Sequence, residues 1–163
     1  MHELYGNHDA SIICVCGSRG IGQKDTVSRI LNGIVDKFAL YLSPPGYVLT
    51  GGAKGIDSYA RDWAEKLDYD WHVMHPDWDH YGKSAGYRRN EDMLEQIRLD
   101  SEAHGIPHYL IAMYDGESPG TKHMIDNYES HFKMKSLIFV SPQTHKDNPT
   151  HEYSSRWDTS FNI

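Results

Sequence analysis

Short apolar runs alternate with longer, helix-like segments along most of the chain. Apolar runs that are rich in β-branched residues and are bounded by glycine, proline or polar residues are typical of strands buried in a sheet. Five such runs are predicted to be strands, at residues 11–16, 47–50, 71–74, 109–113 and 136–140.

The segments between these runs carry apolar residues every three or four positions, which gives a helix one apolar face. Helices are predicted over residues 25–42, 56–67, 87–103 and 120–132, and residues 76–86 are predicted to be a long loop. Right-handed crossovers between successive strands then produce a parallel sheet with helices on both faces. The pattern predicts a Rossmann-like, three-layer α/β/α fold with a mainly parallel sheet of about five or more strands.

The length of 163 residues fits one such domain. We predict an N-terminal extension over residues 1–10, the Rossmann-like domain over 11–141 and a polar C-terminal tail over 142–163. Trp157 and Phe161 are isolated apolar residues in this tail, and they are candidates for docking on the domain or on a neighbouring subunit.

The composition indicates which classes of partner and which cellular compartment to expect. The 16 Lys and Arg residues against 23 Asp and Glu residues give a net charge of -7, which disfavours binding to long nucleic acids. No apolar run approaches the ~20 residues that span a bilayer, and the N-terminus lacks the layout of a signal peptide, so no membrane association is expected. Cys14 and Cys16 cannot cross-link a fold, and we predict two buried, reduced thiols in a cytoplasmic protein.

The candidate chemistry follows the predicted strands. In open parallel sheets, ligands bind outside the carboxyl ends of the strands. Four strand ends carry glycine, hydroxyl, basic or aromatic residues that are candidate ligand-binding groups: Gly17, Ser18 and Arg19; Gly51, Gly52, Gly55 and Asp57; Asp77, Trp78, Arg88, Arg89 and Asn90; Gly120 and Thr121. Glycine lets a phosphate approach the backbone, and the start of a helix favours negative charge. The set therefore predicts a site for a phosphate-bearing ligand.

The standard nucleotide motifs are absent. Residues 17–22 do not fit G-x-G-x-x-G, and residues 51–57 lack the G-K-S/T ending of a P-loop.

The sequence also gives no clear metal-binding pattern. His72 and His75 lie three positions apart, so on one strand they face opposite sides, and no C-x-x-C pair occurs. We therefore expect no metal and no cofactor. Trp78 lies between two aspartates in the predicted loop and is a candidate for stacking on a base.

Three segments together resemble a known superfamily. Residues 16–19 read CGSR, residues 50–60 read TGGAKGIDSYA, and residues 77–93 fit D-W-x-x-x-G-x-x-A-G-x-x-R-N-x-x-M. Over residues 11–140 the chain resembles the SLOG superfamily, in particular its YspA-type, YpsA-related branch. The resemblance implies a Rossmann-like domain that binds a nucleotide or nucleotide-derived ligand and forms a homo-oligomer, with a dimer expected. It also implies that Gly120 and Thr121 hold a phosphate.

The same resemblance leaves three functions open. The related Lonely Guy phosphoribohydrolases carry a glutamate three residues after the equivalent threonine, where this chain has Met124, which has no charge for acid–base work. We therefore expect a binding or sensing module. The alternative is a nucleotide N-glycosidase that uses Asp115, Glu117 or Asp77. A single-stranded nucleic-acid binder like DprA is disfavoured by the acidic balance.

Overall fold

The computed structural model of the protein describes residues 11–18, 24–37, 46–140 and 154–155, and these form an α/β fold around one sheet. The strands are β1 (Ile12–Gly17), β2 (Tyr47–Thr50), β3 (Trp71–Val73), β4 (His108–Tyr114), β5 (Leu137–Val140) and β6 (Ser154–Ser155). Their order is β3-β2-β1-β4-β5-β6, where β1 to β5 are parallel and β6 is antiparallel to β5. The predicted Rossmann-like fold is confirmed.

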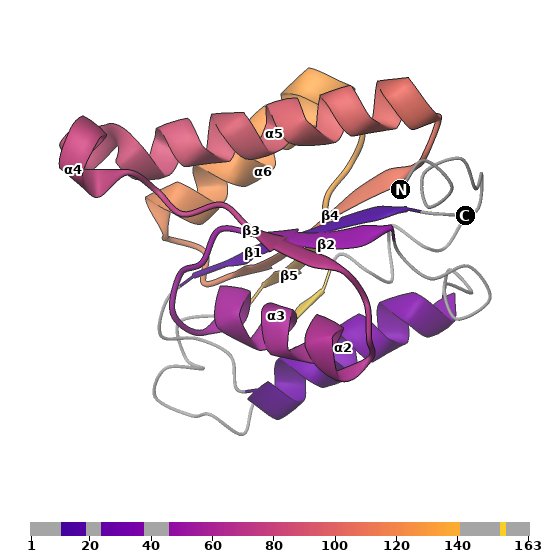
Figure 1. The fold of residues 1–163 in the computed structure, drawn as a ribbon. Helices are drawn as coiled ribbons and strands as arrows, with labels where there is room; N and C mark the ends of the chain where they lie inside the picture. Colours follow the sequence, from indigo (N-terminus) through magenta and orange to yellow (C-terminus); the bar gives the residue numbers. More distant parts are fainter. Residues whose placement is uncertain (1–10, 19–23, 38–45, 141–153, 156–163) are drawn as a thin grey trace.

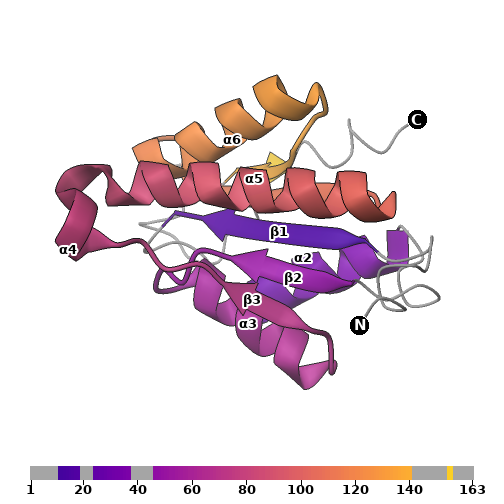
Figure 2. The same cartoon turned by 45° about the horizontal axis from the view of Figure 1, so that its top comes forward.

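Helices cover both faces of the sheet, as Figures 1 and 2 show. One face carries α2 (Lys24–Lys37) and α3 (Ile56–Lys66), and the other carries α5 (Ala85–His104) and α6 (Pro119–Phe132). Successive side chains of β1 pack against opposite helix layers. Ile13 and Val15 pack towards α2 and α3, while Ile12 and Cys14 pack towards α5 and α6. All four side chains are fully buried.

The segment before α5 differs from the prediction. Residues 76–86 are not a loop throughout, because they contain the short helix α4 (Trp78–Tyr81) and a 3-10 turn (Gly82–Ser84), and α5 begins at Ala85. Asp77 caps α4, with its Oδ1 accepting a hydrogen bond from the amide of His80 at 3.1 Å. Turns this short bury no side chain of their own, so they leave no apolar period in the sequence.

Other sequence-based boundaries are close to the observed ones or lie outside the described residues. Strand β3 ends one residue before its predicted end, and α2 is described to Lys37, with the predicted continuation to residue 42 lying outside the described residues. The predicted extension over residues 1–10, Trp157 and Phe161 also lie outside them. In the part of the chain that the structure describes, no helix has the length and apolarity needed to cross a membrane.

The strand order decides where a ligand pocket forms. The chain leaves β1 towards β2 and β3 on one side, and returns to β4 and β5 on the other side. The connections diverge at the carboxyl ends of β1 and β4, which is the switch point where open parallel sheets bind ligands. The residues that follow both strands are therefore brought to the same place.

Gly17, at the end of β1, provides a test of how closely the end of β1 packs against the start of α3. A Cβ atom there would lie 2.4 Å from Cδ1 of Ile56, the first residue of α3, and 2.8 Å from its Cβ and Cγ2. Gly17→Ala is therefore expected to lower the free energy of unfolding by about 1–3 kcal/mol, measured by urea denaturation. Gly33→Ala in α2 is the control, since nothing lies within 4 Å of its added Cβ. It is expected to stabilise by up to about 1 kcal/mol, and equal effects of the two changes would refute the packing argument.

Candidate functional site

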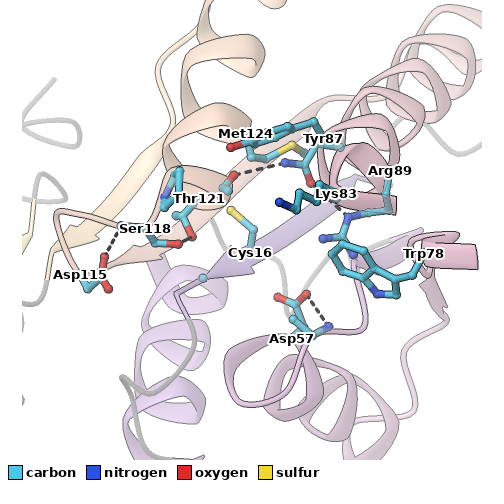
Figure 3. A pocket seen from close by; sticks show the side chains of 16 residues that line it. Cys16, Asp57, Trp78, Lys83, Tyr87, Arg89, Asp115, Ser118, Thr121 and Met124 are labelled. Atoms are coloured by element: carbon cyan, nitrogen blue, oxygen red, sulfur yellow. Dashed lines mark hydrogen bonds between the residues drawn. The ribbon is translucent and has the colours of Figure 1, made fainter. Parts of the chain in front are cut away.

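A pocket of about 470 Å³ opens at the carboxyl ends of β1 and β4. Figure 3 shows its lining from close by, with groups from α6 on one side and groups from the α4–α5 segment on the other. The lining residues are Cys16, Gly17, Ala53, Asp57, Trp78, Lys83, Gly86, Tyr87, Arg89, Asn90, Asp115, Ser118, Pro119, Gly120, Thr121 and Met124. Residues that follow four different predicted strands therefore meet here.

The first turn of α6 offers amide donors to the pocket. The carboxylate of Asp115 accepts hydrogen bonds from the amides of Glu117 at 2.9 Å and Ser118 at 2.7 Å, and Pro119 has no N–H to donate. The amide of Lys122 donates to the carbonyl of Ser118 at 3.0 Å. The amides of Gly120 and Thr121 are therefore the donors of this turn left to meet an anion, as is usual at a helix start.

The hydroxyl groups of Ser18, Thr121 and Ser118 form a short chain of contacts at the start of α6. The Ser18 hydroxyl accepts from the amide of Asp115 at 3.1 Å and lies 3.3 Å from the Thr121 hydroxyl. Thr121 in turn donates to the Ser118 hydroxyl at 3.4 Å. Ser18 is buried outside the lining, so it positions Thr121 instead of meeting a ligand, whereas Ser118 and Thr121 line the pocket.

The two adjacent arginines have different surroundings. The Nη1 of Arg89 donates to the carbonyls of Gly51 and, at 3.4 Å, of Met74, while its Nε donates to Oδ1 of Asn90 at 3.1 Å. Arg89 therefore joins the ends of β2 and β3 to α5, although it also lines the pocket. Arg88 is exposed on another face of α5 and does not line the pocket, which corrects its expected place beside the ligand.

Arg88 is held on the outer surface instead. Its guanidinium lies 4.4 Å from the ring centroid of Tyr81, and its Nε donates to the Ser84 hydroxyl at 3.2 Å. Lys83 is an exposed cation that does line the pocket. Arg19, the remaining predicted cation of the site, lies outside the described residues.

The carboxylates of the pocket are engaged with backbone amides. Asp57, buried in the first turn of α3, accepts from the amide of Ala53 at 3.0 Å, and Asp115 accepts the two amides given above. Of the three predicted catalytic carboxylates, Asp115 therefore lines the pocket, whereas Glu117 is exposed outside the lining and Asp77 caps α4 outside it.

The glycines after β2 shape their loop and do not line the pocket. Gly52 and Gly55 have φ values of 74° and 88°, which residues with a Cβ rarely adopt. Gly51 lies against Arg89, because a Cβ atom at Gly51 would be 2.4 Å from Nη1 of that arginine. Only Gly17 and Gly120, among the predicted ligand-binding glycines, reach the pocket wall.

Two uncharged side chains, Met124 and Cys16, also line the pocket. Met124, one helical turn after Thr121, is buried, and Cys16 lines the pocket from the end of β1. Burial raises the pKa of the Cys16 thiol well above its ordinary value, with the charges of Cys14 and Asp57 adding to the effect, so the thiol is neutral near pH 7. Cys14 is buried as predicted, whereas the pocket-facing position of Cys16 was missed.

Two aromatic side chains stand at the rim. Trp78 is 50% exposed and lies close to Gly86, and Tyr87 is 40% exposed and packs on His123 with 4.5 Å between ring centroids. Ser118 is a second residue that the sequence reasoning missed. Its position directly before Pro119, at the N-cap of the helix, was the available signal.

Comparison with known proteins adds one relative. No known protein-family model matches the chain, and no solved structure matches it. The Gene 61 protein of Mycobacterium phage D29 is 31% identical to the chain over 117 residues, which are 68% of this chain and 82% of the phage protein. The chain belongs to the Gene 61 protein family. That name states no activity.

The different surroundings of the two arginines give a prediction for this Gene 61 family member. Arg89→Gln removes the guanidinium from the carbonyls of Gly51 and Met74, so it is expected to lower the free energy of unfolding by about 1–3 kcal/mol. Arg88→Gln is the matched control and is expected to cost about 1 kcal/mol or less, because its contacts are exposed. Urea denaturation measures both, and a larger loss for Arg88 would contradict the assignment.

Proposed function

We propose that the protein is a binding or sensing module for a nucleotide or nucleotide-derived phosphoribosyl ligand, which it holds in this pocket. The observation that carries the proposal is the division of the pocket between two kinds of group. Amides and hydroxyls of the first turn of α6 lie on one side, and Trp78, Tyr87 and Lys83 come from the opposite side (Figure 3). A volume of about 470 Å³ lies in the range of small-ligand sites.

The α6 side fits one phosphate group. It presents the amides of Gly120 and Thr121, because the neighbouring amides already have acceptors in the protein. It also presents the Ser118 hydroxyl, which accepts from the Thr121 hydroxyl and keeps its own proton for the phosphate. Donors arranged at a helix start, together with the helix dipole, suit a phosphate monoester. A di- or triphosphate would extend beyond these donors towards the carboxylates of Asp57 and Asp115, which repel it.

The opposite side fits a planar ring. Trp78 and Tyr87 offer exposed aromatic surface at the rim, and stacking of a base on an aromatic side chain is worth about 1–3 kcal/mol. Lys83 adds an exposed positive charge to the lining. An acidic protein with such a local arrangement suits a small anion better than a nucleic-acid strand.

Binding is favoured over hydrolysis by the chemistry of the lining. A glycosidase needs a carboxyl group free to donate a proton or to activate water at the scissile bond. Asp57 and Asp115 each use a carboxylate oxygen to hold a backbone turn, and the lining also carries Met124 and a neutral Cys16 thiol. The presence of these two carboxylates in the lining is what keeps N-glycosidase activity as the second candidate.

The SLOG resemblance is part of the proposal. The segment that fits the SLOG pattern most closely, residues 77–93, supplies Trp78, Lys83, Gly86, Tyr87, Arg89 and Asn90 to the lining. A homodimer, which the same resemblance implies, stays a prediction to be tested by light scattering.

A ligand screen tests the proposed function directly. Nucleoside 5′-monophosphates and ribose 5-phosphate are expected to raise the melting temperature, because a ligand at 100 times its Kd stabilises by about 2.7 kcal/mol, or roughly 5–10 °C for a protein of this size. The corresponding triphosphates are expected to give smaller shifts. Chromatography is expected to recover the nucleotides intact, and release of a free base would establish the glycosidase instead. No shift with any of these compounds at millimolar concentration would exclude the proposal.

Hydroxyl deletions test the phosphate end. Ser118→Ala removes a hydrogen bond to the ligand, and Thr121→Val removes the donor that orients the Ser118 hydroxyl. Each is expected to weaken binding of a nucleoside 5′-monophosphate by about 3- to 10-fold, the equivalent of one hydrogen bond. Ser101→Ala is the control, because that hydroxyl donates to the Arg98 carbonyl at 3.2 Å near the far end of α5. Isothermal titration calorimetry measures the Kd values. Unchanged affinity in both pocket variants would show that the first turn of α6 does not bind the phosphate.

A further inference from the structure

The Asn90 side chain joins the two helices that flank the pocket. It is 6% exposed in the second turn of α5. Its Oδ1 accepts from Nε of Arg89 at 3.1 Å, and its Nδ2 donates to the carbonyl of Gly120 at 3.2 Å. The same Nδ2 lies 3.2 Å from Nδ1 of His123 on α6. A carbonyl of the proposed phosphate-binding turn is thus held from α5 through one amide group.

The orientation of this amide is determined by partners whose roles do not change. The Nε of Arg89 only donates, since the guanidinium stays protonated at all relevant pH values, and the carbonyl of Gly120 only accepts. Turning the amide over would set a donor against a donor at Arg89 and an acceptor against an acceptor at Gly120. Asn90 therefore presents N–H, and not oxygen, to His123.

It follows that the Nδ1 of His123 must be an acceptor. A histidine accepts at Nδ1 only when the ring is neutral and its proton is on Nε2. Protonation places an N–H on both ring nitrogens and sets the Nδ1–H against the N–H of Asn90. The conflict can be relieved only by moving the ring or by turning Asn90, which breaks its bonds to Arg89 and Gly120.

We propose that His123 is a positioning residue for ligand binding, whose neutral ring holds Asn90 and, through it, the first turn of α6 in the binding geometry. The proposal rests on the proposed function, since it concerns the affinity of the same pocket. It adds a residue that does not line the pocket and a dependence on pH: acidification that protonates His123 releases this turn and weakens binding.

The surroundings of His123 set the pH range. Burial lowers the pKa of His123 below its ordinary value, and the carboxylates of Glu91 on α5 and Asp126 on α6 oppose that shift. The Tyr87 ring packs on the imidazole from α5, and Lys122 pairs with Asp126 at 2.5 Å. Because the ordinary pKa of histidine is about 6.5, the loss of affinity is expected below about pH 6.5.

Matched variants separate this effect from the titration of the ligand, whose phosphate has its own pKa near 6. His123→Asn places a non-titrating acceptor near the position of Nδ1, and His123→Phe keeps a ring against Tyr87 but removes the acceptor. His131→Asn is the control, since His131 is an exposed histidine in the last turn of the same helix. Calorimetry from pH 5 to 8.5 uses AMP, GMP, CMP, UMP and ribose 5-phosphate as separate probes.

The wild type and His131→Asn are expected to lose affinity below pH 6.5 more steeply than His123→Asn, by up to about tenfold for each pH unit. His123→Asn is expected to match the wild type at pH 8, and His123→Phe to bind more weakly there. Superimposable pH profiles of the wild type and His123→Asn would overturn this inference alone, as would stronger binding of the wild type in acid. Absence of binding by every protein at every pH would overturn the proposed function and this inference together.

Discussion

The pairing of β1 with both β2 and β4 is the constraint on which the site depends. β1 is the central strand of the five parallel ones, and its residues Ile12 to Val15 are fully buried between the helix layers. Because all five strands are parallel, their carboxyl ends meet at one edge, and the connections part there between β1 and β4. The pocket forms at that point because the helices leave it uncovered, and it is lined by short loops and helix starts.

Most charged groups near the pocket serve its construction. Arg89 holds the carbonyls at the ends of β2 and β3, Asp57 holds the loop before α3, and Asp115 holds the turn before α6. A buried carbonyl or amide left without a partner costs about 1–3 kcal/mol, so these side chains are needed where the loops leave the sheet. The other groups of the lining are amides, hydroxyls, aromatic rings and one exposed lysine, and this set fits the proposed binding role.

The contacts between α5 and α6 show how the two sides of the pocket are kept in register. Asn90 bonds to Arg89 within α5 and to Gly120 across the gap, and Ser18 joins the end of β1 to Thr121 and Asp115. The proposed phosphate-binding turn is thus hydrogen-bonded to α5 through Asn90 and to the end of β1 through the two bonds of Ser18. These few hydrogen bonds fix the position of the turn. A change in any one of their donors or acceptors therefore alters that position.

The order of strands and helices, the position of the pocket and much of its lining were predictable from the sequence, because apolar periodicity and glycine-rich strand ends are local properties. Gly17, Asp57, Trp78, Arg89, Asn90, Asp115, Gly120 and Thr121 all reach the pocket as a set of strand-end residues. Arg88 and Arg89 look alike in the sequence, yet one stacks on Tyr81 outside while the other braces Gly51. Only the tertiary structure decides between them, because folding brings the carbonyls of Gly51 and Met74 beside Arg89 and the ring of Tyr81 beside Arg88. The contacts of Ser18 and the proposed role of His123 were likewise decided by the tertiary structure, since their hydrogen-bond partners Thr121, Asp115 and Asn90 are distant in the chain and brought near by folding.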